Sequence, residues 1–210
     1  MELRLVNTRR VNKKMRIELV VAVYREKIFW LGEVDKNIKI KAYAKYMRFD
    51  FDFEDYLENI GRESQTYCYH IIKNYQNLAD FTIFSQGNPF VHLKNEFDNP
   101  YVELFSGNHL YVNDFYPLDG LSICNQKGAP FSSWEINLGE IWDELFLSVC
   151  PDNFIAIYGA QFIVSKELIR MRSYEFWVYL NELHKKYVHL PWALEIMWFY
   201  IFDPRFKTKF

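Results

Sequence analysis

Two short apolar runs, each ending in polar residues, do most to restrict how this chain can fold. Residues 16–24 are largely β-branched and almost continuously apolar, as in a strand buried on both faces. Residues 80–85 form a second such run and stop at Gln86, where a glycine, an asparagine and a proline follow. Between them a helix is predicted just after Asn59, because apolar residues recur there at helical spacing. This strand–helix–strand order predicts parallel strands with helices on the faces of the sheet.

The other predicted elements complete a single α/β domain over residues 1–210, with a mostly parallel central sheet flanked by helices. Ser165 and Ser173 are typical N-caps, and Pro191 is typical of a helix start. Further strands are predicted at 38–43, 110–112 and 154–164 (broken at Gly159), helices at 136–149, 166–171, 174–186 and from residue 191, and a loop at 49–58.

Composition and charge restrict the class of protein. Half of the residues are hydrophobic and 19% are aromatic, which predicts a large core rich in rings. The formal net charge of −2 gives no electrostatic reason to expect nucleic acid as a partner. No apolar stretch approaches the ~18 residues of a membrane span, and the first residues lack the order of a signal peptide. Three cysteines without metal-ligand spacing fit reduced thiols, so we expect a cytoplasmic protein without a structural zinc site.

The N-terminal arm, residues 1–15, is basic. The first sixteen residues hold six arginines and lysines against the single acid Glu2. Such an arm can lie against the anionic inner face of a membrane, as a peripheral contact. The alternative is a solvated segment before the first strand.

Several uncommon strings occur in order along the chain. They are Asn59-Ile-Gly-Arg-Glu63 with Tyr67 and His70, Asn74-Tyr-Gln-Asn-Leu-Ala-Asp80, Phe84-Ser-Gln-Gly-Asn-Pro89 with His92, Gly159-Ala-Gln-Phe-Ile-Val-Ser-Lys-Glu-Leu-Ile169 and Pro191-Trp-Ala-Leu-Glu-Ile-Met-Trp198. Together they resemble a family catalogued as a domain of unknown function, number 3431, over roughly residues 18–202. The family name itself implies no function.

One of these strings extends the resemblance. Gly159-Ala-Gln-Phe-Ile-Val-Ser-Lys-Glu167 is similar to a stretch of GT-A glycosyltransferases, especially metal-independent branching N-acetylglucosaminyltransferases. The similarity implies a GT-A-like domain with a nucleotide-sugar donor, in which this stretch lines the acceptor side of the cleft. It also implies a catalytic base on a downstream helix, where Glu195 holds the comparable place. Tyr24 and Arg25 follow the first strand, where such a fold receives the nucleotide base and ribose.

Sugar transfer also needs positive charge, a metal or backbone dipoles to stabilise the departing diphosphate. Arg62 is the candidate cation, because a helix N-terminus favours anions; a surface ion pair with Glu63 is the alternative. Asn59 and Gly61 have the alternative of capping and turning the chain. The predicted donor-binding residues are Tyr24, Arg25, Asn59, Gly61, Arg62, Glu63, Gln86, Gly87 and Asn88.

Glu195 is the candidate base that takes the proton of the acceptor hydroxyl. Burial among the neighbouring aromatic residues would raise its pKa and suit it to work near neutral pH; a place on the solvated stripe of the helix is the alternative. The predicted acceptor-binding residues are His92, Trp134, Tyr158 and Gln161. For His92 the alternative is a structural role, and for Trp134 a place in the aromatic core.

Metal-ligand motifs are weak. GT-A enzymes usually hold a metal with Asp-x-Asp, and Asp50-Phe-Asp52 has that form, but it follows no buried strand and also fits an exposed acidic loop. At the end of the 80–85 strand the chain offers Gln86 and Asn88, whose neutral amides are poor sole ligands for a hard cation. We therefore expect metal-independent catalysis, with Mn or Mg as the alternative.

These observations together predict a glycosyltransferase that uses Glu195 and Arg62 in catalysis. The expected donor is a uridine diphosphate sugar, and the expected acceptor is a hydroxyl of a surface polysaccharide or lipid-linked glycan. The alternative is a non-catalytic carbohydrate- or protein-binding module on a transferase-like fold. A hydrolase would need a nucleophile elbow or a metal cluster, and neither is recognisable here.

Overall fold

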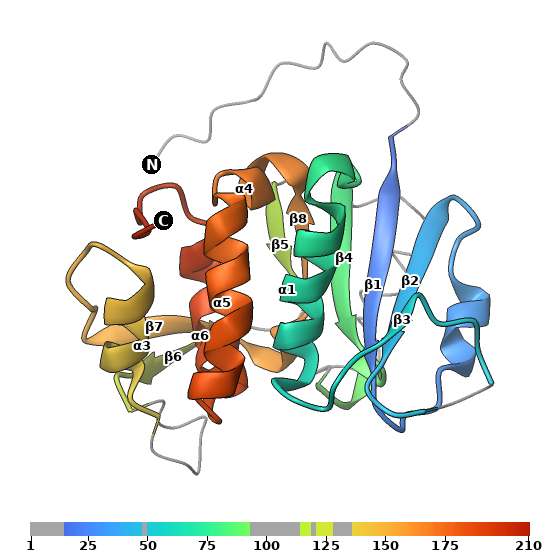
Figure 1. The fold of residues 1–210 in the computed structure, drawn as a ribbon, viewed down its shortest axis with the longest axis horizontal. Coiled ribbons are helices and arrows are strands. Elements are labelled where there is room, and N and C mark those ends of the chain that lie inside the picture. The colour runs from blue at the N-terminus through green and yellow to red at the C-terminus, as the bar shows by residue number, and fades with distance from the viewer. Residues whose placement is uncertain (1–14, 48–49, 93–113, 119–120, 128–135) are drawn as a thin grey trace.

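A six-stranded sheet forms the centre of the molecule (Figure 1). This computed structural model describes residues 15–47, 50–92, 114–118, 121–127 and 136–210. The strand order is β3-β2-β1-β4-β8-β5, and a second sheet pairs β6 with β7. The bounds are β1 Ile17–Val23, β2 Ile38–Ala44, β3 Asp55–Tyr56, β4 Phe81–Gln86, β5 Phe115–Pro117, β6 Leu121–Asn125, β7 Asn153–Ile157 and β8 Phe162–Ser165.

The sheet is mixed, so the expectation of a mostly parallel sheet is wrong. β1 pairs in parallel with β2 and β4, and β2 pairs in parallel with β3. β8 is antiparallel to both of its neighbours, β4 and β5. The reason lies at Gly159 and Ala160, whose φ values of 67° and 52° turn the chain from β7 into β8. The predicted strand 154–164 is therefore two strands in two different sheets.

The central strand β1 is buried along its whole length, as its apolar sequence predicts. Val20 and Ala22 face the helices, whereas Leu19 and Val21 face a second cluster on the opposite side of the sheet. Burying a side chain of this size stabilises the fold by about 1.5–3 kcal/mol. β1 thus sits between two hydrophobic clusters and fixes the middle of the sheet.

The helices pack over one face of the sheet, on the side of Val20. The bounds are α1 Arg62–Asn74, α3 Leu138–Leu145, α4 Lys166–Arg170, α5 Tyr174–Lys186 and α6 Leu190–Ile201, with short 3₁₀ turns η1 Phe29–Glu33, η2 Tyr75–Asn77, η3 Pro89–His92 and η4 Tyr158–Ala160. α6 packs against α1, η4 and β7, and so joins both sheets to one core. Ser165 and Ser173 accept backbone N–H bonds as N-caps, which confirms their predicted role. No helix of the described residues is long and apolar enough to cross a membrane.

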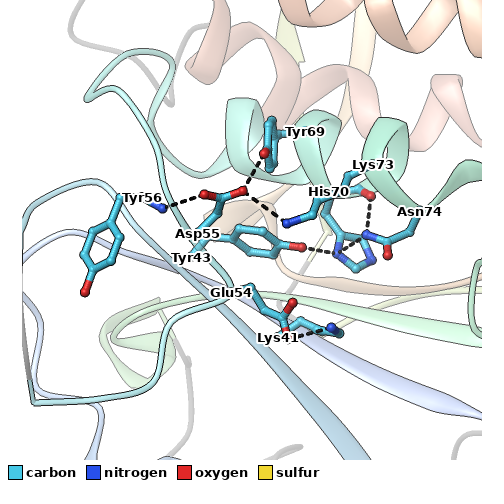
Figure 2. A network of polar contacts seen from close by, with 9 residues as sticks. All are labelled: Lys41, Tyr43, Glu54, Asp55, Tyr56, Tyr69, His70, Lys73 and Asn74. Carbon is cyan, nitrogen blue, oxygen red and sulfur yellow. Dashed lines mark hydrogen bonds and ion pairs between the residues drawn. The ribbon is translucent and has the colours of Figure 1, made fainter.

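A polar network fastens α1 to β2 and to the edge strand β3 (Figure 2). The Tyr43 hydroxyl lies 2.9 Å from His70 Nδ1, and both side chains are buried. Asp55 accepts from the Tyr69 hydroxyl at 2.6 Å and from Lys73 Nζ at 3.1 Å. β3 lies within the stretch predicted as a loop. It was not predicted because its two residues carry no strand pattern, and side-chain contacts with α1 support it.

The remaining predicted elements have different outcomes. The predicted helix 136–149 is shorter, because Phe146 is extended and pairs with Thr208 near the C-terminus. The predicted strand 110–112, residues 1–14 of the basic arm, and Trp134 lie outside the described residues. The strands β5 and β6 were not predicted.

Candidate functional site

The sheet has a switch point between β1 and β4. From β1 the chain moves outward to β2 and β3, then returns on the other side of β1 as β4. At such a point the loops that follow two adjacent parallel strands run in opposite directions and leave a crevice between them. α/β proteins bind ligands in this crevice. The carboxyl ends lie at the lower edge of the sheet in Figure 1, where α1 and α6 also begin. This edge is the candidate functional site.

The loops after β1 and β4 nevertheless touch each other here, across the crevice that this topology usually leaves open. The Glu26 carboxylate accepts from the backbone N–H groups of Tyr24 at 2.7 Å and Arg25 at 3.1 Å. A Cβ on Gly87 would lie 2.7 Å from Glu26 Oε2, and the Trp30 indole donates to the Gly87 carbonyl at 2.9 Å. A side chain at position 87 would have to displace the Glu26 carboxylate, so glycine allows this close packing. Glu26 and Trp30 are site residues that the sequence analysis did not identify.

An exposed guanidinium lies between two rings at the ends of β1 and β2. Arg25 Cζ is 4.9 Å from the ring centroid of Tyr24 and 4.6 Å from that of Tyr46. The two rings meet edge-on at 6.0 Å. Among the described residues, no carboxylate forms an ion pair with Arg25. Its charge is held by cation–π contacts and stays open to an anionic ligand.

Two glutamines tie the β4 loop to the turn before β8. Gln161 is fully buried; its Oε1 accepts from the backbone N–H of Gln86 at 3.3 Å, and its Nε2 donates to the Pro89 carbonyl at 3.1 Å. Gln86 Nε2 donates to the Gly159 carbonyl at 2.8 Å. Both amides thus bind backbone, a structural role that fixes this edge. Their contact with donor or acceptor stays a prediction.

The start of α1 meets the start of α6 at the same edge. Arg62 Cζ lies 5.3 Å from the ring centroid of Trp192, and Arg62 Nε lies 3.4 Å from Glu63 Oε2. About half of the Arg62 side chain is exposed (52%), whereas Glu63 is buried. Glu195 is half-buried and follows Trp192 by three residues on α6, which brings it to the same helical face. Arg62 therefore contacts Glu63, its expected partner in the alternative of an ion pair, and also the helix that carries Glu195.

Backbone strain gathers at this edge. Among the described residues, the non-glycine residues with positive φ are Arg62 at 46° and Ala160 at 52°, and each follows a glycine that is also left-handed. Left-handed residues cost free energy and often mark functional positions. Since Gln86 binds η4, η4 packs on α6 and α6 meets Arg62, contacts link the two strained turns along one edge.

Lys45 is a buried cation that the sequence analysis missed. It follows β2 directly, just as Arg25 closely follows β1, and that position was the available signal. Its Nζ donates to the carbonyls of Glu58 at 3.1 Å and Ile60 at 2.7 Å and to Gln65 Oε1 at 2.5 Å. Burial lowers the pKa of Lys45 to about 8.

A buried serine–histidine pair supports the first turn of α1. Ser64 Oγ lies 2.8 Å from His184 Nε2, and His184 Nδ1 lies 3.1 Å from the Leu180 carbonyl. The carbonyl requires a proton on Nδ1, so Nε2 of the neutral ring is an acceptor. It shares the single Ser64 hydroxyl proton with the Gly61 carbonyl, which also lies 2.8 Å from Ser64 Oγ. Burial lowers the pKa of His184 to about 4, which keeps the ring neutral. Both side chains are inaccessible, so the pair holds α1 against α5 and is not a nucleophile.

The structure also gives the positions of the other predicted site residues. Asn59 and Asn88 are exposed, and the structure places His92 in η3 and Tyr158 in η4. Asp50 and Asp52 lie on an exposed segment between β2 and β3. Within the described part of the chain, no group of three or more His, Cys, Asp or Glu side chains could hold a metal ion.

Comparison with known proteins identifies the family and nothing more. No curated protein and no solved structure matches the chain. The similarity to GT-A glycosyltransferases therefore stays a prediction. A family match covers residues 19–208, close to the span of the resemblance found in the sequence. The chain belongs to the family described as Protein of unknown function (DUF3431).

Proposed function

We propose that the protein is a glycosyltransferase with a GT-A-like fold. It would move a sugar from a nucleotide donor, expected to be a uridine diphosphate sugar, to a hydroxyl of a surface polysaccharide or lipid-linked glycan. The observation that supports the proposal is that Arg25 follows β1 while Arg62 and the helix of Glu195 are in contact, all at the carboxyl edge of the sheet beside the switch point. Exposed cations can stabilise the departing diphosphate, and a carboxylate can take the proton of the acceptor hydroxyl.

Each group has a role in the proposed reaction. Arg62, beside the N-terminus of α1, would stabilise the departing diphosphate together with the helix dipole. Arg25, with the rings of Tyr24 and Tyr46, would hold the nucleotide. Glu195 would take the proton of the acceptor hydroxyl as that oxygen attacks the anomeric carbon. The buried amides of Gln86 and Gln161 would keep the loops in place.

A nucleoside diphosphate should stabilise the protein against heat. Ligand at a hundred times its dissociation constant adds about 2.7 kcal/mol of stability. For a chain of this size that corresponds to a rise in melting temperature of roughly 5–10 °C. A thermal-shift panel of nucleoside diphosphates measures it, with the matching nucleosides as controls. No shift with any nucleotide would contradict the proposal.

Glu195→Gln should lower donor turnover by about 10²–10⁴-fold, since the variant cannot accept a proton. Binding of the nucleoside diphosphate should persist, because the variant keeps the shape of the side chain. The control is Glu175→Gln, an exposed glutamate on the first turn of α5 at the opposite edge. Turnover measured with a panel of nucleotide sugars tests this, and near-normal turnover would remove Glu195 as the base. Loss of turnover with EDTA, restored by Mn, would overturn metal independence.

A carbohydrate- or protein-binding module without catalysis is the second candidate. It is favoured by the engagement of Gln86 and Gln161 with backbone groups, which leaves fewer polar side chains for a donor. Such a module would bind glycans without nucleotide and would turn over no donor. A cytoplasmic place at the inner face of a membrane, through the basic arm, stays part of the proposal and is tested by sedimentation with anionic vesicles.

A further inference from the structure

One ammonium group holds the turn that leads into α1. Lys45 Nζ donates to the carbonyls of Glu58 and Ile60, in the segment just before the turn, and to the side chain of Gln65 just after it. Gln65 in turn donates to Asn181 Oδ1 on α5 at 3.4 Å. These acceptors use all three N–H groups of a charged lysine. Lys45 therefore joins the end of β2 to the residues on both sides of the turn that leads into α1.

That turn carries the cation of the proposed site. Gly61 and Arg62 are both left-handed, with φ values of 60° and 46°. A left-handed arginine persists only where its surroundings impose the conformation. The imposed backbone also sets the direction of the guanidinium, which lies over Trp192.

We propose that Lys45 is a positioning residue that holds the left-handed Gly61–Arg62 turn and thereby presents the Arg62 guanidinium to the diphosphate of a bound nucleotide. The inference rests on the proposed function for its ligand, but not for its effect on the turn. Lys45 itself does not touch the nucleotide, because its three donors are already engaged.

The protonation of Lys45 should control this turn. A neutral amine has two N–H groups, so one of the three acceptors would lose its bond above the pKa of about 8. The charged or titratable groups that face Lys45 are Glu58, Glu63, Cys68 and His184. Burial raises the pKa of Cys68 and lowers that of His184 to about 4, so neither titrates between pH 7 and 9.5.

The test measures binding of uridine diphosphate by calorimetry from pH 7 to pH 9, where the phosphate is largely ionised and the uracil ring is largely neutral. Wild-type affinity should fall by about tenfold as pH rises through 8. Lys45→Met should bind weakly with a flat profile, whereas Lys45→Arg should keep its affinity at pH 9 because arginine stays charged. The matched control is Lys41→Met, on the strand that precedes Lys45 and paired with Glu54, and it should follow the wild type (Figure 2).

As pH rises, the contribution of Lys45 to folding stability should increase while the affinity for the nucleotide falls. A buried lysine with a lowered pKa is neutral in the native state while the unfolded chain still binds the proton. The contribution of Lys45 to the free energy of unfolding therefore rises between about pH 8 and 10.5. Affinity that falls while this contribution rises is expected of a positioning residue and not of a general loss of structure.

Hydrogen exchange separates this inference from the proposed function. In Lys45→Met the amides of residues 58–65 should exchange faster than in wild type and in Lys41→Met, without any ligand. Unchanged exchange there, or wild-type affinity that stays flat across pH 8, would overturn the inference. If the wild type binds no nucleoside diphosphate, the proposed function fails, and the exchange of residues 58–65 alone decides whether Lys45 holds the turn.

Discussion

Acidification from pH 7.5 to pH 5 should reduce the free energy of unfolding by about 4 kcal/mol, through two buried histidines. Burial lowers the pKa of His70 to about 3 and that of His184 to about 4, against the usual 6.5. Below pH 6.5 the unfolded chain therefore binds two protons that the native state excludes. Each histidine then costs about 1.4 kcal/mol of stability per pH unit until its native pKa is reached. For a domain with a typical 5–15 kcal/mol this is a large share.

The size of the effect depends on the contacts of the His70 ring. His70 Nδ1 lies beside the Tyr43 hydroxyl and Asn74 Nδ2, both of which can donate to it, so a second ring proton would displace them (Figure 2). Glu18 Oε2 lies 3.7 Å from His70 Nε2 and works in the opposite direction, because burial raises the pKa of Glu18. Protonation of Glu18 in the native state thus returns part of the lost stability, and Glu18→Gln should steepen the loss.

Urea unfolding at a series of pH values measures this dependence. His70→Asn and His184→Asn should each lower stability at pH 7.5 and each remove about half of the slope between pH 6.5 and 5. The exposed His189→Asn is the matched control and should keep the wild-type slope. The acids with lowered pKa values, such as Asp80 and Asp203, lose their contribution only below about pH 4 and do not overlap this window. A wild-type stability that is level from pH 6.5 to 5 would show that the rings are not buried as described.

The elements that sequence patterns predicted well are those whose burial is set locally. The run 16–24 contains β1, and the pattern 174–186 coincides with α5, because its serine cap and apolar spacing lie within one segment. β8 runs against its neighbours for a reason that no local pattern records. Its direction depends on two left-handed residues and on the chain leaving a separate sheet.

The same division holds for the candidate site. The strand-end rule predicted that Arg25, Arg62 and Gln86 lie at one edge of the sheet, and the structure places them at that edge. The partners that fix those residues come from elsewhere in the chain: Ser64 and His184 are 120 residues apart. Periodicity cannot identify such pairs, so it did not predict the roles of Lys45 and His184 or the backbone contacts of Gln86 and Gln161.

Gly61→Ala should lower the free energy of unfolding by about 3 kcal/mol or more. A left-handed conformation costs an alanine roughly 1–2 kcal/mol relative to glycine. The added Cβ would also lie 2.3 Å from His184 Cδ2 and 2.6 Å from Gln65 Cβ, where nothing can move without shifting α5 away from α1. Overpacking of a buried contact typically adds a further 1–3 kcal/mol.

Gly32→Ala is the matched control, because a Cβ there would meet no atom within 4 Å and the residue is not left-handed. Equilibrium unfolding in urea should therefore show a large loss for position 61 and little change for position 32. The double variant Gly61→Ala with His184→Ala relieves the clash with His184, but neither the contact with Gln65 Cβ nor the strained φ, so it should be less destabilised than the sum of the two single variants. Additive losses would mean that His184 does not press on Gly61. Because the strained Arg62 follows Gly61 directly, the same substitution should also weaken nucleotide binding if the proposed site is real.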